Sequence, residues 1–398
     1  MSSPERARDF GFGADEEMLR DVATRLLDEH LPVEKLRRLV ASDPEAAYER
    51  GERPPWDEGL WKRMVELGWP ALAVPPEHGG HGFKLAGIAA LMEQVGRHAV
   101  PSPFVASSNA TLVLREAEGA CASAWLSRIA DGLATSLAIT DAEGSWEPDD
   151  CGVTARETPE GLVLSGAAHF VQDAFKVDAF TTTARCGDAL RLCVVPRDAA
   201  GLELHQDHIH DLTRDQATLH FHEVRVPARD VVDADAAAIL RRAWPGLLVV
   251  VAADLCGSSE WQLQATVRYA QERVQFERPI GFFQAVKHPL VDAMVAIDRG
   301  RALVYAAAAA IDAGADDALR LARMAKSAAS DAGAFVSDRS VQLHGGVGFT
   351  WEFDVHLFFK RSLHNQALYG DGVHQRRKLA DLLIGPLAGG PAAESRGE

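Results

Sequence analysis

Apolar residues recur at helical spacing in the first third of the chain. Met18, Val22, Leu26 and Leu27 fall on one stripe, at steps of three to four, which is the period of an amphipathic helix. The segments 61–67 and 88–95 behave alike, and a glycine-rich stretch at 79–82 separates them. The pattern predicts an N-terminal helical domain over residues 1–130.

The pattern changes twice further along the chain. Between 131 and 235, short runs rich in Val, Thr, Leu and Phe alternate with turn residues, which predicts an antiparallel β-domain, a barrel or sandwich. From 236 to 385 the sequence is Ala-rich with few helix breakers, which predicts a four-helix bundle. We therefore expect an α+β fold of three domains, followed by a disordered Gly/Pro/Ala-rich tail at 386–398.

Composition narrows the class of protein. The 398 residues include 41 Lys and Arg against 57 Asp and Glu, a net charge of −16, so we expect no nucleic-acid partner. No run of 18 apolar residues occurs and the N-terminus is charged, so we expect neither a membrane span nor a signal peptide. Five cysteines without C-x-x-C spacing indicate reduced thiols in a cytoplasmic protein.

Several chemical motifs are present only in weak form. His220 and His222 alternate on one predicted strand and could bind a metal, although a solvated strand face is the simpler interpretation, and we predict no metal site. Gly11 and Gly13 precede a helix but follow no strand and lack a third glycine, so a dinucleotide-binding Rossmann fold is not expected.

Two segments are more informative. Residues 269–288, YAQERVQFERPIGFFQAVKH, lie between two predicted helices and contain arginines suited to bidentate phosphate contacts. Residues 341–351, VQLHGGVGFTW, place glycines directly after a long helix, where the backbone could approach a ligand closely. Each segment alone could equally be a helix cap and a turn.

Together, the two segments resemble the acyl-CoA dehydrogenase family. The resemblance runs through nearly the whole chain in the same order. Further matching segments are LGWPALAVPPEHGGHG at 67–82, AITDAEGS at 138–145, HFVQDA at 169–174 and VRVP at 224–227. The family's architecture, a β-domain between two helical domains, is also the one that the pattern predicts.

The resemblance implies FAD, bound non-covalently between the β-domain and the bundle. It implies that Thr140 bonds the flavin ring and that Phe170 packs on the isoalloxazine. It also implies that Gly144 and Ser145 meet the pyrophosphate or the thioester of the substrate.

A neighbouring subunit is expected to complete the site. By resemblance, Arg273 pairs with the FAD diphosphate, while Phe276 and Gln284 hold the adenosine half. The residues expected to close over it are Gln342, Gly345 and Gly346. The implied partners are an acyl-CoA or acyl-carrier-protein thioester and an electron-transferring flavoprotein, with assembly as a homo-oligomer or heterotetramer.

The chain departs from the family at the catalytic base. Dehydrogenation needs a carboxylate that removes the α-proton while the β-hydride goes to flavin N5. Tyr369 takes the place of the usual Glu, and Leu247 takes the place of the alternative base on the bundle's first helix. Glu277 replaces a family glycine and puts a negative charge near an expected phosphate.

Three interpretations follow. The chain could be an active dehydrogenase with a relocated base, for which Asp371 is the first candidate, ahead of Asp254 and Glu277. Asp371 could instead cap the helix that begins near Val373, or bond FAD. The chain could be a base-less partner subunit, as the similarity of 368–371 to an actinobacterial heteromeric subgroup suggests. It could also be a fold relative with flavin monooxygenase or oxidase chemistry.

Overall fold

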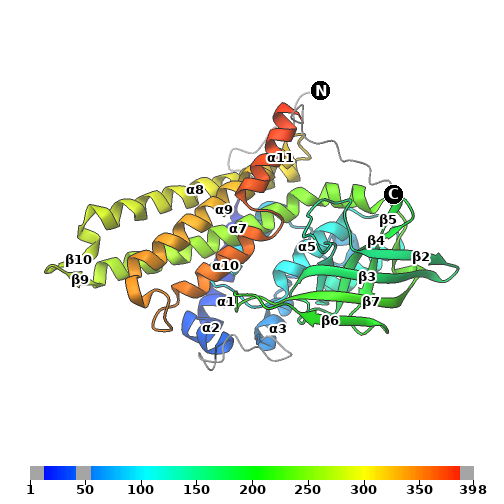
Figure 1. Cartoon of the computed structure of the whole chain (residues 1–398), viewed down its shortest axis with the longest axis horizontal. Coiled ribbons are helices and arrows are strands. Elements are labelled where there is room, and N and C mark those ends of the chain that lie inside the picture. The colour runs from blue at the N-terminus through cyan, green and yellow to red at the C-terminus, as the bar shows by residue number, and fades with distance from the viewer. Residues whose placement is uncertain (1–12, 42–54, 386–398) are drawn as a thin grey trace, which may run out of the picture.

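The computed structural model describes residues 13–41 and 55–385 and places a sheet domain beside a long bundle of helices (Figure 1). The predicted tail at 386–398 lies outside the described residues, as do Gly11 and Phe12. The N-terminal helices are α1 (Ala14–His30), α2 (Val33–Val40), α3 (Glu58–Glu66), α4 (Leu85–Arg97), α5 (Phe104–Arg115) and α6 (Ala120–Ala130). Leu27 of the predicted stripe is buried, whereas Met18 is 63% exposed.

The central sheet is mostly antiparallel. Its strands are β1 (Thr135–Ala138), β2 (Val153–Thr158), β3 (Gly161–Gln172), β4 (Ala179–Cys186), β5 (Ala189–Pro196), β6 (Leu202–Gln206), β7 (Gln216–Pro227) and β8 (Val231–Val232). The order is β6-β7-β3-β2-β4-β5-β8, and β1 pairs with β4. The β1–β4 and β2–β4 pairings are parallel, so the sheet is mixed, while the predicted α+β class is confirmed.

The C-terminal domain is built on one long buried helix. The helices are α7 (Ala236–Glu272), α8 (Gln284–Asp312), α9 (Ala318–His344), α10 (Val355–Ala367) and α11 (Gly372–Ile384), and a hairpin of β9 (Val274–Gln275) and β10 (Arg278–Pro279) joins α7 to α8. α7 begins at Ala236 because the Asp235 side chain caps it, accepting a hydrogen bond from the Ala237 amide.

α7 is the one helix of the described ranges that is long and apolar enough to cross a membrane. However, 83% of its most apolar stretch is buried inside the molecule. α7 packs against α4 and α5 of the N-terminal domain and against α8, α9 and α10. Its apolar composition is therefore accounted for by its position at the core of the fold.

Candidate functional site

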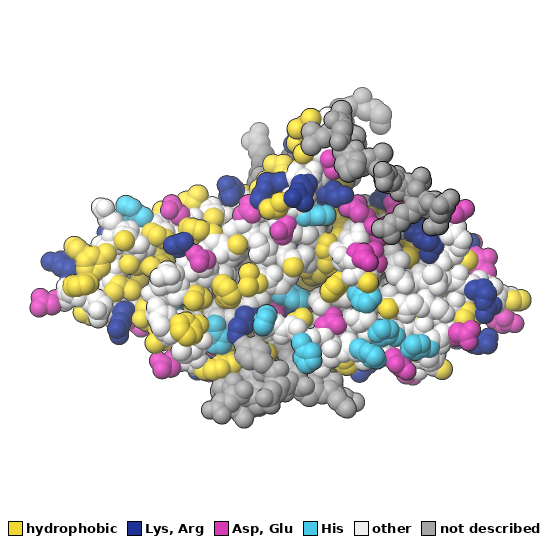
Figure 2. Space-filling view, viewed as in Figure 1, with side chains coloured by type: hydrophobic (Ala, Val, Ile, Leu, Met, Phe, Trp, Pro, Cys, Tyr) yellow, Lys and Arg dark blue, Asp and Glu magenta, His cyan; other side chains and the backbone are white. Residues whose placement is uncertain are grey.

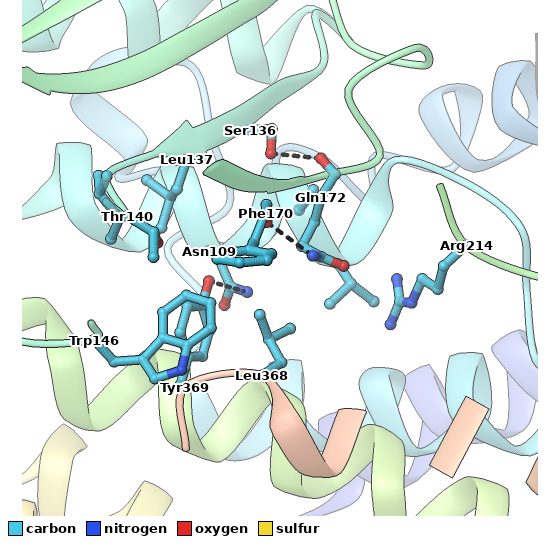
Figure 3. Close-up of a pocket in the computed structure, with 13 residues that line it drawn as sticks. Asn109, Ser136, Leu137, Thr140, Trp146, Phe170, Gln172, Arg214, Leu368 and Tyr369 are labelled. Atoms are coloured by element: carbon cyan, nitrogen blue, oxygen red, sulfur yellow. Dashed lines mark hydrogen bonds between the residues drawn. The ribbon is translucent and has the colours of Figure 1, made fainter. Parts of the chain in front are cut away.

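Two adjoining cavities lie where the sheet meets the C-terminal helices. Figure 3 shows the inner one, which helix α5 also lines. The inner cavity has a volume of about 20 Å³ and the outer one about 250 Å³. Trp146, Phe170, Gln172 and Leu368 line both. The inner cavity has room for about one water molecule, whereas the outer one could take a flat ring system.

Phe170 is presented to these cavities by a β-bulge. The pairing of β3 with β7 shifts register between Ala168 and Val171, and Phe170 takes a left-handed backbone with φ of +57°. Bulges of this kind re-aim a side chain next to a binding site. The Phe170 ring stays 37% exposed, facing Gly144 of the β1–β2 loop, so its aromatic face is open to a ligand.

Tyr369 fills the space beside the inner cavity. Its ring lies 5.3 Å from those of both Trp146 and Trp244, and the Asn109 amide donates a 3.2 Å hydrogen bond to its hydroxyl. Only 4% of Tyr369 is exposed, and burial raises the pKa of its phenol well above the usual value. The residue that the resemblance places at the family's base position is therefore a neutral aromatic that is enclosed on several sides.

No carboxylate lines either cavity among the described residues. Asp254 is wholly buried on α7, and both of its oxygens are occupied. Arg361 donates to them at 2.9 and 2.6 Å, and Arg214 and Asn365 donate at 3.0 and 2.6 Å. Leu247 of α7 is wholly buried and apolar, and no residue of α7 lines either cavity. This helix therefore offers no base to the cavities.

Asp371 is positioned as a helix cap. Its carboxylate accepts a 2.7 Å hydrogen bond from the His374 amide at the start of α11. Asp371 does not line the cavities, although it stands two residues after Tyr369. This geometry favours the capping role, and catalysis by Asp371 stays a prediction.

The polar wall of the cavities combines Gln172, from the HFVQDA segment, with residues that the sequence did not single out. Gln172 accepts a 2.5 Å hydrogen bond from His364 of α10 and donates to Gln216. Burial lowers the pKa of His364 to about 4, so this imidazole is neutral at physiological pH. Arg214 also faces the inner cavity (Figure 3). Of the residues that line the cavities here, Gln172 stands in a segment that carries the family resemblance, and Trp146 directly follows another, AITDAEGS.

The predicted flavin residues of the β-domain lie at or beside this site. Thr140 lines the inner cavity, Gly144 lines the outer one, and Phe170 lines both. Ser145 is adjacent, but its hydroxyl donates to Asp150 rather than facing the cavities. An exposed aromatic face, a buried hydroxyl and a glycine loop are groups that fit a flavin ring.

The other predicted flavin residues lie at the far end of the bundle, around the β9–β10 hairpin (Figure 1). They are Arg273, Phe276, Gln284, Gln342, Gly345 and Gly346, all exposed. The Arg273 guanidinium has no hydrogen bond or ion pair within the described ranges. A Cβ at Gly345 or Gly346 would meet nothing within 4 Å, so packing within this chain does not require glycine there. One copy of the chain cannot bring this end to Phe170.

Apolar side chains gather at the same end of the bundle (Figure 2). Phe276 is 85% exposed at the tip of the hairpin, and both Phe276 and Glu277 adopt left-handed backbone angles, with φ of +53° and +62°. Such angles are costly for residues with a Cβ. An exposed aromatic on a strained turn is consistent with a contact outside this chain.

The histidine pair lies on an exposed sheet surface. His205, His220 and His222 stack along β6 and β7, and Glu203 lies 3.6 Å from two of these rings. Within residues 13–41 and 55–385, no group of three or more possible ligands could hold a metal ion. The five cysteines are free thiols.

The chain belongs to the acyl-CoA dehydrogenase family, which confirms the predicted resemblance. The family's N-terminal domain model matches residues 13–133, and its C-terminal domain model matches residues 249–384. The family consists of flavoprotein oxidoreductases, and the chain is accordingly an acyl-CoA dehydrogenase-type enzyme.

Individual relatives come from actinobacteria. Acyl-CoA dehydrogenase IpdE2 of Mycobacterium tuberculosis is 33% identical over 349 residues, which covers 87% of this chain and 91% of that protein. The protein of the same name from Mycolicibacterium smegmatis is 28% identical and covers 92% and 97%.

Solved structures share the fold. A variant of the Tcur3481–Tcur3483 steroid acyl-CoA dehydrogenase superposes with a TM-score of 0.82 at 27% identity, covering 94% of this chain and 98% of that one. The ChsE4–ChsE5 complex of Mycobacterium tuberculosis superposes with a TM-score of 0.84 at 23% identity, covering 96% and 100%. Both are complexes of two different chains.

Proposed function

We propose that this chain is a flavin-holding, base-free subunit of a heteromeric acyl-CoA dehydrogenase. The observation that supports this most is the enclosure of Tyr369 at the family's base position, beside an inner cavity of about 20 Å³. An acyl chain needs far more space, and α-proton abstraction needs a carboxylate in reach of the carbon. The described residues around these cavities offer neither the space for an acyl chain nor the carboxylate, so a different subunit has to supply both.

The residues of this chain fit FAD at two separate places. Gly144 and Phe170 would hold the isoalloxazine in the outer cavity, with Thr140 on the side of the inner one, and FAD would supply the acceptor for the β-hydride of the acyl thioester. The neutral His364 and Gln172 would give that cavity a polar edge without adding a charge. Leu368 would exclude water from the opposite wall.

The distal end of the bundle would serve a flavin held by a neighbouring subunit. Arg273 is a free guanidinium suited to a diphosphate, and Gly345 and Gly346 leave room for close approach of a ligand. Glu277 opposes such a diphosphate by charge, so this end would bind flavin less tightly than a family member with glycine there. The flavin sites of such a heteromer would therefore differ in their affinity for flavin.

The substrate class follows from similarity. The steroid acyl-CoA dehydrogenase that shares this fold at 27% identity suggests a bulky, polycyclic acyl thioester for the assembled enzyme. The predicted substrate is an acyl-CoA or acyl-carrier-protein thioester, and the predicted electron acceptor is an electron-transferring flavoprotein.

A carboxylate introduced at the base position tests the proposal. The Tyr369→Glu variant places an acid where the family has one, and Tyr369→Gln is its matched neutral control. With FAD bound and oxygen excluded, an acyl-CoA should bleach the flavin only in the Glu variant, and slowly. Bleaching of the wild-type chain at a rate equal to or above that of Tyr369→Glu would show that a base is already present.

A further inference from the structure

Lys326 is a wholly buried lysine on α9 that the proposed function does not use. Its exposure is 0%, and Asp371 is the charged group near enough to raise its pKa appreciably. Burial outweighs that effect and lowers the Lys326 pKa to about 7. A buried amine of this kind is costly, so the contacts that it makes need an explanation.

Those contacts converge on one loop. The Lys326 amine donates to the carbonyls of Gln366 and Gly370, both at 2.9 Å, and to the Ser330 hydroxyl at 3.0 Å. Gln366 lies in the last turn of α10, whose carbonyls lack partners within the helix. The amine therefore binds the end of α10 and the turn after it at once, like a C-terminal helix cap.

The loop that it binds is strained. Tyr369 and Gly370 have φ of +58° and +88°, and a Cβ at Gly370 would come within 2.3 Å of the His374 ring. A non-glycine residue in this region is destabilised by its Cβ, so Tyr369 needs outside contacts to stay there. Gln375 also donates to the Tyr369 carbonyl at 2.6 Å.

We propose that Lys326 is the positioning residue that holds the 368–370 loop, and with it Tyr369 and Leu368, against the two cavities. The amine acts through the backbone carbonyls and touches neither cavity itself. Loss of the amine removes the donor at the Gln366 carbonyl and leaves the Gly370 carbonyl only a long 3.5 Å hydrogen bond from Gln375, and the left-handed turn then relaxes. The inference that Lys326 orders the loop is independent of the proposed function. The expected effect of Lys326 on flavin binding rests on that function.

Hydrogen–deuterium exchange on the ligand-free full chain tests this directly. Lys326→Met should raise the exchange of amides in 366–372 by roughly tenfold or more, as expected when a hydrogen bond is lost. Lys326→Gln keeps an N–H donor and should give a smaller rise. Lys62→Met, which removes an exposed lysine on α3, is the matched control and should change nothing there.

Flavin affinity gives a second readout. FAD should dissociate from Lys326→Met at least several-fold more readily than from the wild type, with Lys326→Gln in between. A folded Lys326→Met protein with wild-type exchange in 366–372 would overturn the proposal. If Lys326→Met does not fold, wild-type exchange in Lys326→Gln would overturn it equally. Failure of the wild type to bind FAD would count against the proposed function alone.

Discussion

At the scale of single residues, the Asp371 carboxylate has two candidate roles, as the cap of helix α11 and as the catalytic base. Asp371 caps α11 through the His374 amide. Replacing it with Ala should lower the free energy of unfolding by about 1 kcal/mol, whereas Asn, which also caps, should cost only a few tenths. Chemical denaturation of the two variants measures this. Flavin reduction that disappears in a fully folded Asp371→Asn enzyme, in its assembled form, would instead identify Asp371 as the base.

Tyr369 allows a second residue-scale prediction. Tyr369→Phe removes the hydroxyl that accepts from Asn109, which leaves a buried amide without its partner. The variant should be less stable by about 1–2 kcal/mol, and the visible spectrum of bound flavin should not change. A stability equal to that of the wild type would mean that Asn109 finds another partner.

The sequence could predict some of these residues and not others. Phe170, Thr140 and Gly144 stand in short local motifs, so resemblance alone located them, and the structure places them at the cavities. Asn109 and His364 come from separate helices, and only the tertiary fold brings them to the site. Neither a motif nor a helical period could have signalled that convergence.

At the scale of elements, buried charges join the sheet domain to the bundle. Asp173 and Arg214 of the sheet domain connect to Asp254 of α7, which binds Arg361 of α10. Asp254→Asn would leave two buried guanidinium groups with less compensation. It should lower the free energy of unfolding by about 3–5 kcal/mol. Arg376→Gln, at the exposed pair with Asp331, is the control and should cost less than about 1 kcal/mol.

The same network predicts an acid limit of stability. Burial alone would raise the pKa of Asp173, but the charges of Lys176 and Arg214 outweigh it and lower that pKa below the unfolded value. A group with a lowered folded pKa stabilises the fold above its unfolded pKa of about 4, and this contribution is lost as the pH falls further. Unfolding free energy should therefore drop below pH of about 4, and less steeply in Lys176→Met. Equal slopes would contradict this.

The strands show which elements a local sequence pattern can predict and which it cannot. β4 and β5 are rich in Val, Thr, Leu and Phe and are mostly buried, which is the pattern that predicted the β-domain. β2 lacks that pattern, since its sequence VTARET is largely polar and its strand conformation depends on pairing with β3. Tertiary pairing can thus override a weak local signal.

At the scale of the whole molecule, the two groups of residues that we propose to bind flavin lie at different ends of the chain's fold (Figure 1). Arg273→Ala should lower the FAD content of the assembled protein several-fold while leaving the unfolding free energy nearly unchanged, because the Arg273 side chain is exposed and its guanidinium makes no hydrogen bond or ion pair with described residues. Absorbance at constant protein concentration measures the FAD content. Unchanged content would remove Arg273 from the site, and Arg299→Ala, an exposed arginine on α8, is the control.

Exposed apolar residues on the bundle predict assembly. They include Phe276, Val291, Met294, Val295 and Leu383. Patches of this kind mark protein interfaces, so sedimentation of the flavin-loaded protein should show a dimer or larger species. A flavin-loaded monomer would contradict this and would require both halves of the site to meet within one chain.

The central claim is that this chain holds flavin but has no base of its own. The most direct measurement is the visible spectrum of the FAD-loaded chain, purified without a partner subunit, during anaerobic titration with acyl-CoA thioesters that include a steroid-type one. The account predicts that the oxidised flavin band persists through the titration and then bleaches on addition of dithionite, which shows that the flavin can be reduced. Bleaching by the acyl-CoA itself would contradict the account and would mean that the chain dehydrogenates its substrate unaided.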